Sequence, residues 1–274
     1  MKKKKTLLKY VLNTCALFFI SAMLSILPIY IMFVMATQDT NVLHHGNFFI
    51  PGDSLAQNFS TILDRRFIRM FLNSFYIGIV VSVLNVFISS MMGFIFAKYN
   101  FRYKELLYNI ILIKIIIPTQ AILMAFIILM IRFNLANTHF PLIIPPAFSV
   151  VGVFWMTEYI KTNISDQMLE AAKVDGCGLV KLYLNFILPN IKPGITFIFI
   201  LAFIWSWNSY LIPLFLISNS DLFTVPLGIT LLGNHLVTDY SARILAMLLG
   251  TLPVILVFII GSKYFVQGNM FGGN

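Results

Sequence analysis

Six long apolar runs constrain the fold of this chain more than any other feature. They lie near residues 11–36, 71–97, 106–131, 141–160, 194–217 and 243–265. Each is long enough to cross a hydrocarbon layer of roughly 30 Å, which takes about 20 helical residues. Hydrophobic residues make up 59% of the 274 residues and charged residues only 11%, a balance that excludes an ordinary soluble domain. We therefore expect one all-α, polytopic membrane domain over residues 1–274 with six transmembrane helices.

The fourth run is the weakest of the six because Pro141, Pro145 and Pro146 crowd its start. Proline is tolerated in the first turn of a helix, where the missing N–H would have no intrahelical partner. We interpret these prolines as the entry to a span more than as a break within one.

The net charge of +9 invites a nucleic-acid interpretation, but the distribution of basic residues argues against it. With the N-terminus inside the cell, 13 lysines and arginines face the cytosol and 5 face outward. The inner set is Lys2, Lys3, Lys4, Lys5, Lys9, Lys98, Arg102, Lys104, Lys161, Lys173, Lys181, Lys192 and Lys263, and the outer set is Arg65, Arg66, Arg69, Arg132 and Arg243. The positive-inside rule predicts this asymmetry. We expect both termini in the cytosol, membrane lipid as surroundings and no nucleic-acid partner.

The N-terminus resembles a secretory signal, because lysines precede an apolar run. That run is about 25 residues long, whereas the apolar region of a signal peptide has roughly 7–15 residues. We therefore expect an uncleaved first span.

Motifs for catalysis are missing from the sequence. It has no G-x-x-x-x-G-K-[ST] phosphate loop, so we do not expect the chain to hydrolyse ATP. No H-x-x-x-H motif or cysteine cluster offers a metal site, and we interpret Cys15 and Cys177 as small apolar fillers. The spans also lack the paired carboxylates or histidines that a membrane-embedded enzyme would need. We expect a protein that is not an enzyme and holds no cofactor or metal.

Residues 161–193 form the one long cytosolic loop, and good helix formers fill its first part, residues 164–174. Ser165 or Asn163 can cap the start of this helix, and Asp166 suits its first turn. Gly176 can end it in the left-handed conformation. A short exposed helix of this kind, with adjacent alanines that allow close approach, is typical of a docking surface.

A second short helix can follow over residues 178–187. Pro189 and Pro193 then turn the chain back into the fifth span. The alternative interpretation of the first of these two helices is a solvated amphipathic loop helix.

The loop carries a spaced motif over 24 residues. Its members are Glu170, Ala171, Ala172, Asp175, Gly176, Leu188, Pro189 and Pro193. On these residues the chain resembles the ABC importer permeases, whose EAA motif has the same spacing. Tyr183 stands where phenylalanine is common in that family, Cys177 replaces a usual alanine, and Ser165 replaces a usual proline.

Further segments resemble the carbohydrate-uptake branch of that family, the maltose-type permeases with a short N-terminus. They are Asn73-Ser74, Ile117-Pro118-Thr119-Gln120, Asn134-Leu135-Ala136-Asn137-Thr138, Trp207-Asn208, Pro213-Leu214 and Tyr264-Phe265-Val266-Gln267-Gly268. The resemblance covers nearly the whole chain, although the tail lacks the terminal lysine usual in the family.

The resemblance implies a type I ABC importer permease fold in the inner membrane of a prokaryote. It implies that Glu170, Ala171, Ala172, Asp175 and Gly176 form a coupling helix seated in a cleft of a nucleotide-binding subunit. It also implies the partners: a second homologous permease in a heterodimer, two ATPase subunits that bind the ATP, and an extracellular solute-binding protein. The expected function is ATP-driven import of a sugar, with an oligosaccharide as the first choice of substrate.

Polar and aromatic residues within spans are the candidates for a substrate path. They are Asn85, Ser89, Gln120, Trp207, Asn208 and Tyr210. Rings with an adjacent amide suit sugars, which offer apolar ring faces and many hydroxyls. The alternatives are hydrogen bonding between helices for Asn85 and Ser89, and an interfacial aromatic belt for the tryptophans.

Other functions stay open at this point. One alternative is a permease for another solute, such as glycerol phosphate, an acidic sugar or a peptide. Among these solutes, Arg65, Arg66 and Arg69 favour an anionic one. An ATP-independent channel or carrier is another, but it leaves the motif spacing unexplained. The sequence does not name the sugar, nor does it say which permease chain of a pair contacts it or whether the ATPase is dedicated or shared.

Overall fold

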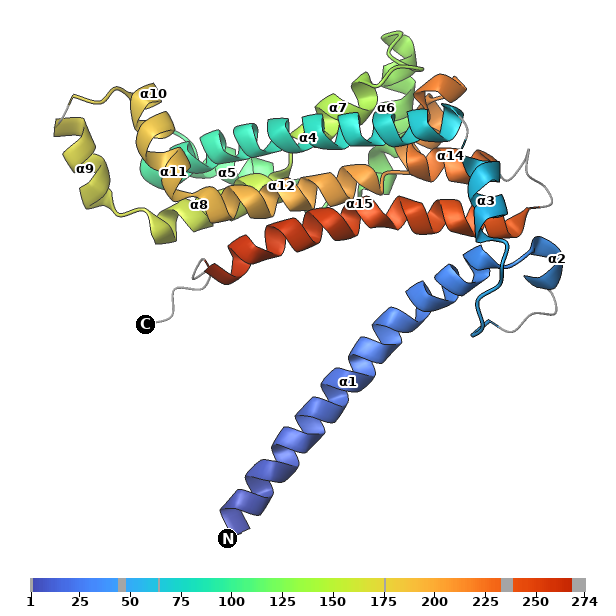
Figure 1. The fold of residues 1–274 in the computed structure, drawn as a ribbon. Coiled ribbons are helices and arrows are strands. Elements are labelled where there is room, and N and C mark those ends of the chain that lie inside the picture. Colours follow the sequence, from blue (N-terminus) through green and yellow to red (C-terminus); the bar gives the residue numbers. More distant parts are fainter. Residues whose placement is uncertain (1, 44–47, 64, 175, 233–238, 268–274) are drawn as a thin grey trace. The chain divides into compact units, whose positions relative to one another are not determined.

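The computed structural model describes residues 2–43, 48–63, 65–174, 176–232 and 239–267. In these residues every regular element is helical (Figure 1). The elements are α1 (Lys2–Thr37), α2 (Thr40–Leu43), α3 (Leu55–Ile62), α4 (Arg65–Lys98), α5 (Lys104–Ile113), α6 (Thr119–Arg132), α7 (Phe140–Ala147), α8 (Val150–Asn163), α9 (Asp166–Val174), α10 (Leu179–Leu182), the π-helical turn η1 (Tyr183–Ile187), α11 (Leu188–Asn190), α12 (Lys192–Trp207), α13 (Leu211–Leu216), the 3₁₀ turn η2 (Ser220–Leu222), α14 (Val225–Leu232) and α15 (Tyr240–Gln267). The expected all-α class is confirmed.

Four stretches of the described chain are long and apolar enough to cross a membrane: Tyr10–Thr37, Arg66–Lys98, Phe140–Asn163 and Tyr240–Lys263. A fifth is obtained if Leu179–Asn190 and Lys192–Trp207 count as one span bent by 81°. The structure thus supports a polytopic protein with four or five candidate spans, where the sequence predicts six.

The difference in number arises because the third and fifth apolar runs are interrupted. In the third, α5 ends at Ile113 and α6 begins at Thr119, and Pro118 between them has an extended backbone with ψ 128°. Proline has no N–H to donate and disfavours a helical conformation in the preceding residue. In the fifth, α12 ends at Trp207 and α13 begins at Leu211.

The fourth run begins as expected, with Pro141 in the first turn of α7. It also contains a break, which the sequence did not lead us to expect: α7 ends at Ala147 and α8 begins at Val150. Ser149 caps the second helix, since its hydroxyl accepts a hydrogen bond from the Gly152 N–H at 3.1 Å.

The described residues fall into two compact units, and the expected single domain over 1–274 stays a prediction. The first unit comprises residues 1–67 and 229–252, and the second comprises residues 68–228 and 253–274. In the first unit, the Asn58 amide donates to the carbonyls of Ala36 and Gln38 at 2.9 Å each. The Thr40 hydroxyl donates to the Asp239 carboxylate at 2.8 Å. The Asn58 bonds fold the segment after α1 back onto the end of that helix, and the Thr40 bond joins that segment to the residue before α15.

In the second unit, α4 and α8 approach each other through glycine. A Cβ atom placed on Gly93 would lie 2.7 Å from the Met156 Cβ, and one on Gly152 would collide with the side chains of Asn85 and Ser89. Helices in membranes associate through small residues of this kind, because lipid gives little hydrophobic driving force between apolar helices. The close contact therefore depends on both glycines.

We predict that Gly93→Ala destabilises the protein although alanine is the better helix former. The added methyl group overpacks the contact with Met156, at a cost of about 1–3 kcal/mol. Thermal unfolding of the full chain in detergent micelles measures the effect. The matched control is Gly178→Ala, because a Cβ atom there meets nothing within 4 Å. Equal stability of the two variants would contradict this account of the contact.

Candidate functional site

The helix expected in the first part of the 161–193 loop is present as α9, and its ends have the predicted chemistry. It runs over Asp166–Val174, and the Ser165 hydroxyl accepts a hydrogen bond from the Met168 N–H at 3.3 Å. Gly176 has a φ of +74°, the left-handed conformation that glycine adopts most readily. Asp175 lies outside the described residues. The predicted start at residue 164 was wrong, because Ile164 and Ser165 precede the first helical turn.

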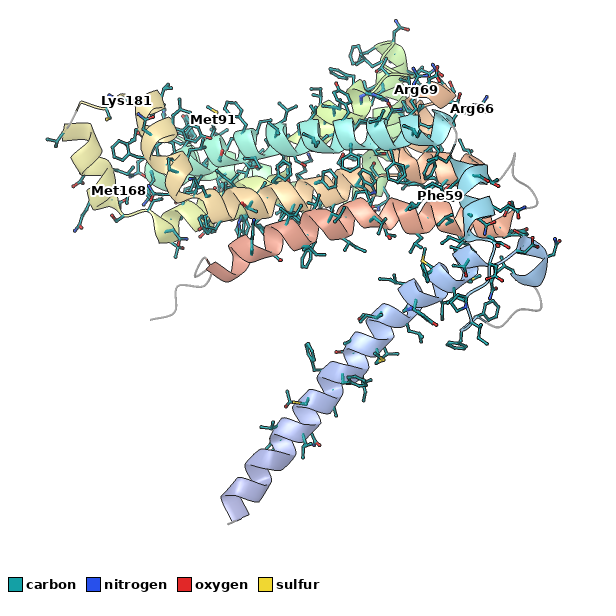
Figure 2. The ribbon with its side chains drawn as sticks, in the orientation of Figure 1. Phe59, Arg66, Arg69, Met91, Met168 and Lys181 are labelled. Atoms are coloured by element: carbon teal, nitrogen blue, oxygen red, sulfur yellow. The ribbon has the colours of Figure 1, made fainter. Side chains whose placement is uncertain are left out.

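One face of α9 is exposed and the other is anchored. Glu170 is exposed, and Val174 retains 87% of its accessible surface. Leu169 is buried with 5% exposed. Figure 2 shows Met168 on this helix at one end of the second unit. The backbone of Ala171 and Ala172 is helical, within α9.

An ion pair joins α9 to the last residue of α4. The Lys98 amino group lies 2.7 Å from the Asp166 carboxylate. The Lys98 side chain is buried, with 6% exposed, whereas that of Asp166 is 81% exposed. Sequence reasoning placed Asp166 in the first turn of its helix and Lys98 on the inner side just after the second span, but it missed the pair, because no local pattern links residues 68 positions apart.

The segment after α9 differs from the single helix predicted over 178–187. It consists of α10, the π-helical turn η1 and α11. The Tyr183 hydroxyl in η1 and the Ser90 hydroxyl in α4 share a hydrogen bond of 2.6 Å. A π-turn inserts one extra residue per turn, often at functional sites, and helix propensity gives no signal for it. Sequence reasoning did not single out Ser90, and it noted Tyr183 only as the aromatic residue that stands in place of a common phenylalanine.

A buried apolar cluster includes Tyr183 and joins several of these elements. It contains residues from α4, α8, α9, α10, η1 and α12, namely Phe94, Met156, Tyr159, Ile160, Ile164, Leu169, Leu182, Tyr183, Ile187, Ile191 and Ile198. Figure 1 shows α9, α10 and α11 at one end of α4 and α12. The segment from α10 to η1 is therefore packed as part of this helix bundle, whereas α9, among its described side chains, enters the cluster through Leu169 alone, so the alternative of a solvated amphipathic helix stays open for α9.

The structure uses Asn85 and Ser89 between helices. Both are buried, with 2% and 0% exposed. The Asn85 amide donates to the Pro146 carbonyl at 3.2 Å, and the Ser89 hydroxyl donates to Asn85 Oδ1 at 3.2 Å. This arrangement corresponds to the helix-packing alternative, and a role for the two residues in a substrate path stays a prediction.

The remaining path candidates lie at the interruptions of the third and fifth runs. Gln120 is exposed in the first turn of α6, two residues after Pro118. Asn208 directly follows α12, and Tyr210 precedes α13. Trp207 is 2% exposed, and its ring centroid lies 5.0 Å from that of Phe75, so it belongs to a buried aromatic cluster.

Comparison with known proteins decides the family. Residues 85–268 match the family described as binding-protein-dependent transport system inner membrane component. The chain belongs to this family. It is the permease component of a bacterial ABC transporter, a multi-pass inner-membrane protein and not the catalytic subunit. A transporter of this kind also has ATPase and binding-protein subunits.

Relatives of this permease include the arabinooligosaccharides transport system permease protein AraQ of Halalkalibacterium halodurans. It is 30% identical over 201 residues, which is 73% of this chain and 72% of AraQ. The sn-glycerol-3-phosphate transport system permease protein UgpE of Yersinia pestis is 27% identical over 259 residues, 91% of this chain and 92% of UgpE. A chain from the crystal structure of a bacterial ABC transporter for the acidic polysaccharide alginate has the same fold, with a TM-score of 0.80, 20% identity and coverage of 93% and 96%.

We predict that Asp166→Asn destabilises the permease more than Glu158→Gln does. Glu158 pairs with Lys161 at the same distance of 2.7 Å, but both of those side chains are nearly half exposed. Loss of that pair costs less than about 1 kcal/mol. Asp166→Asn leaves a buried ammonium without its anion, at about 1–3 kcal/mol. Chemical unfolding in detergent compares the two, and equal losses would mean that the burial of Lys98 has no energetic weight.

Proposed function

We propose that this permease imports a sugar, of the oligosaccharide class, by coupling closure of two ATPase subunits to alternating access through α9. In this proposal it pairs with a second homologous permease. A solute-binding protein delivers the substrate from outside, both termini are cytosolic, and α5 with α6 completes the sixth span.

The observation that carries the coupling proposal is the attachment of α9 to the bundle. Its outer face, with Glu170 and Val174, is free of contacts with the buried cluster and available to a partner surface. Its inner face enters that cluster through Leu169, and its first residue is paired with Lys98. A helix held in this way transmits a push or pull, because closely packed interiors move as units and do not deform continuously.

The attachment also identifies which helices the motion would reach. The cluster joins α9 to α8 and α12, the two helices on either side of the loop in sequence, and also to α4. The Ser90–Tyr183 hydrogen bond and the Lys98–Asp166 ion pair are two polar links to α4. We propose that α4, α8 and α12 swing together when α9 is displaced.

Support for a substrate path comes from the interrupted helices. Non-helical backbone at membrane depth is tolerated where it is buried in protein or lines a cavity. Transporters place substrate groups at such helix ends. We propose that the breaks at residues 114–118 and 208–210 contribute to the path, with Gln120, Asn208 and Tyr210 as its polar groups.

A phosphate ester is the second candidate substrate. The UgpE relative favours it, as do Arg66 and Arg69 near the start of α4, which are exposed and are labelled in Figure 2. Arg69, however, forms an ion pair with Asp221, so its charge already has a counterion. We favour the sugar for that reason and because AraQ, whose name refers to arabinooligosaccharides, has the higher identity.

Glu170→Lys tests the coupling. We expect uptake to fall at least about tenfold, equivalent to ~1.4 kcal/mol of coupling free energy, while the amount of permease in the membrane is unchanged. Thr162→Lys is the control, since it also introduces an exposed lysine but does so in the last turn of α8, outside α9. Normal uptake by Glu170→Lys would contradict the proposed seat of α9.

Cross-linking tests the same contact directly. With Cys15 and Cys177 replaced by serine, a photo-crosslinker on Val174→Cys is expected to capture the ATPase subunit, and one on Thr162→Cys is expected to capture much less. No adduct from Val174→Cys in intact cells would overturn the coupling role of α9.

The substrate is tested by uptake of radiolabelled arabinooligosaccharide and sn-glycerol 3-phosphate in cells that express the complete transporter. We expect unlabelled oligosaccharide to reduce the uptake of the radiolabelled arabinooligosaccharide, and sn-glycerol 3-phosphate to leave that uptake unchanged. The reverse pattern would establish the second candidate.

A further inference from the structure

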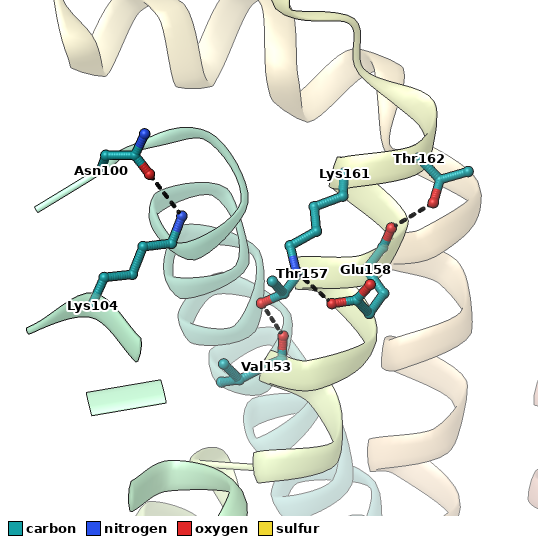
Figure 3. Close-up of polar contacts among 7 residues, drawn as sticks. All are labelled: Asn100, Lys104, Val153, Thr157, Glu158, Lys161 and Thr162. Atoms are coloured by element: carbon teal, nitrogen blue, oxygen red, sulfur yellow. Dashed lines mark hydrogen bonds and ion pairs between the residues drawn. The ribbon is translucent and has the colours of Figure 1, made fainter. Parts of the chain in front are cut away.

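A polar pocket lies between the first turn of α5 and the last two turns of α8, on elements outside the proposed coupling surface. Its volume is about 320 Å³, and its polar lining comprises Lys104, Glu105, Tyr108, Asn109, Thr157 and Lys161. Figure 3 shows Lys104 and Lys161 on separate segments, Lys104 extending to Asn100 and Lys161 extending to Glu158. The pocket therefore brings two ammonium groups and a carboxylate from two helices to one place.

The charges in this pocket are incompletely used by the protein. The Lys104 amino group has one long hydrogen bond, 3.4 Å from Asn100 Oδ1. Among the described residues, neither Lys104 nor Glu105 takes part in a salt bridge. Lys161 pairs with Glu158 and lies 5.8 Å from the centre of the Tyr108 ring. A ligand that carries both an anion and a cation would complement Lys104 and Glu105 together.

The position of the pocket along the helices suits an amphiphile. α5 begins at Lys104 and α8 ends at Asn163, so the pocket lies where two apolar segments end. Deeper along the two helices lie exposed apolar residues: Ile113, two turns from Glu105, is 54% exposed, and Phe154, two turns from Lys161, is 42% exposed. A polar head in the pocket would thus continue into chains that lie against Ile113 and Phe154.

We infer that this pocket binds the headgroup of an aminophospholipid, a phosphodiester with a primary amine. Lys104 and Lys161 receive the phosphate through charge-assisted hydrogen bonds, and Glu105 receives the ammonium. A purely anionic headgroup satisfies the lysines but meets Glu105 with a like charge. A free sugar has no charge for either group and no chain for the apolar strip.

The test uses the full-length permease in its complete transporter, purified in mild detergent and washed free of bulk lipid. Native mass spectrometry measures the lipid that remains bound, and thermal unfolding is followed in nanodiscs of phosphatidylcholine with added phosphatidylethanolamine or phosphatidylglycerol. We expect phosphatidylethanolamine to be retained and to raise the unfolding temperature more than phosphatidylglycerol does. Lys104→Gln with Lys161→Gln should weaken retention at least about tenfold.

Two further variants make the result specific. Glu105→Gln is expected to keep a bound phospholipid but to lose the preference for phosphatidylethanolamine over phosphatidylglycerol. Arg102→Gln is the matched control, because it removes a positive charge next to the pocket from a residue that stacks on the Tyr103 ring and does not line it. It should leave retention unchanged.

Three outcomes would overturn the inference. Unchanged lipid retention in the double lysine variant would exclude this pocket as the site. An equal rise in unfolding temperature with inorganic phosphate alone would show that the pocket is a phosphate site and not a lipid site. A crosslink from Asn109→Cys to the second permease subunit, in place of lipid, would make a protein the occupant.

Discussion

The need to satisfy every backbone hydrogen bond in lipid is the constraint on which the rest of this structure depends. It explains why the described chain is helical, and it gives meaning to the places where the helices stop. Residues 114–118 and 208–210 interrupt the regular α-helices within apolar runs, with Pro118 and Asn208 at the breaks. Such breaks persist where protein or water meets the freed groups, so the interruptions are better candidates for a substrate path than any uninterrupted helix.

The specific packing of one helix against another comes from small residues and hydrogen bonds more than from hydrophobicity. Gly93 and Gly152 let α4 and α8 approach closely, and the Ser89 and Asn85 side chains use the space that Gly152 provides. Near the end of α4, apolar packing takes over in the cluster around Phe94. The bundle is therefore fastened by polar contacts along α4 and by a dense core beside α9, where a force on the loop would enter.

Local features of this permease could be predicted from its sequence because their causes are local. Ser165, Asp166 and Gly176 determine the ends of α9 through a cap, a dipole contact and a positive φ, and each depends on neighbours within a few residues. The helices α1, α4 and α15 follow from apolar length. The motif from Glu170 to Pro193 identified the family for a different reason, namely its resemblance to known permeases.

The contacts that could not be predicted from the sequence join residues far apart in the chain. The pairs Lys98–Asp166 and Ser90–Tyr183 join positions 68 and 93 residues apart. The breaks near Pro118 and Asn208 show a second limit: apolar content predicts that a run enters lipid, but not that it stays helical throughout. Asn85 and Ser89 show a third, since a polar residue in a span is equally consistent with a path and with helix packing, and only its neighbours distinguish the two.

The lysines near the ends of α4, α5 and α8 show how one residue type serves different purposes at one level of the molecule. Lys98 is buried and paired with Asp166, so its charge is committed to holding α9. Lys161 shares its charge between Glu158 and the Tyr108 ring, and Lys104 has only a long bond to Asn100. The positive-inside rule treats all three alike, as charges that fix topology. Their surroundings separate them, because a buried and paired lysine resists displacement while an open and weakly bonded one is available to a ligand.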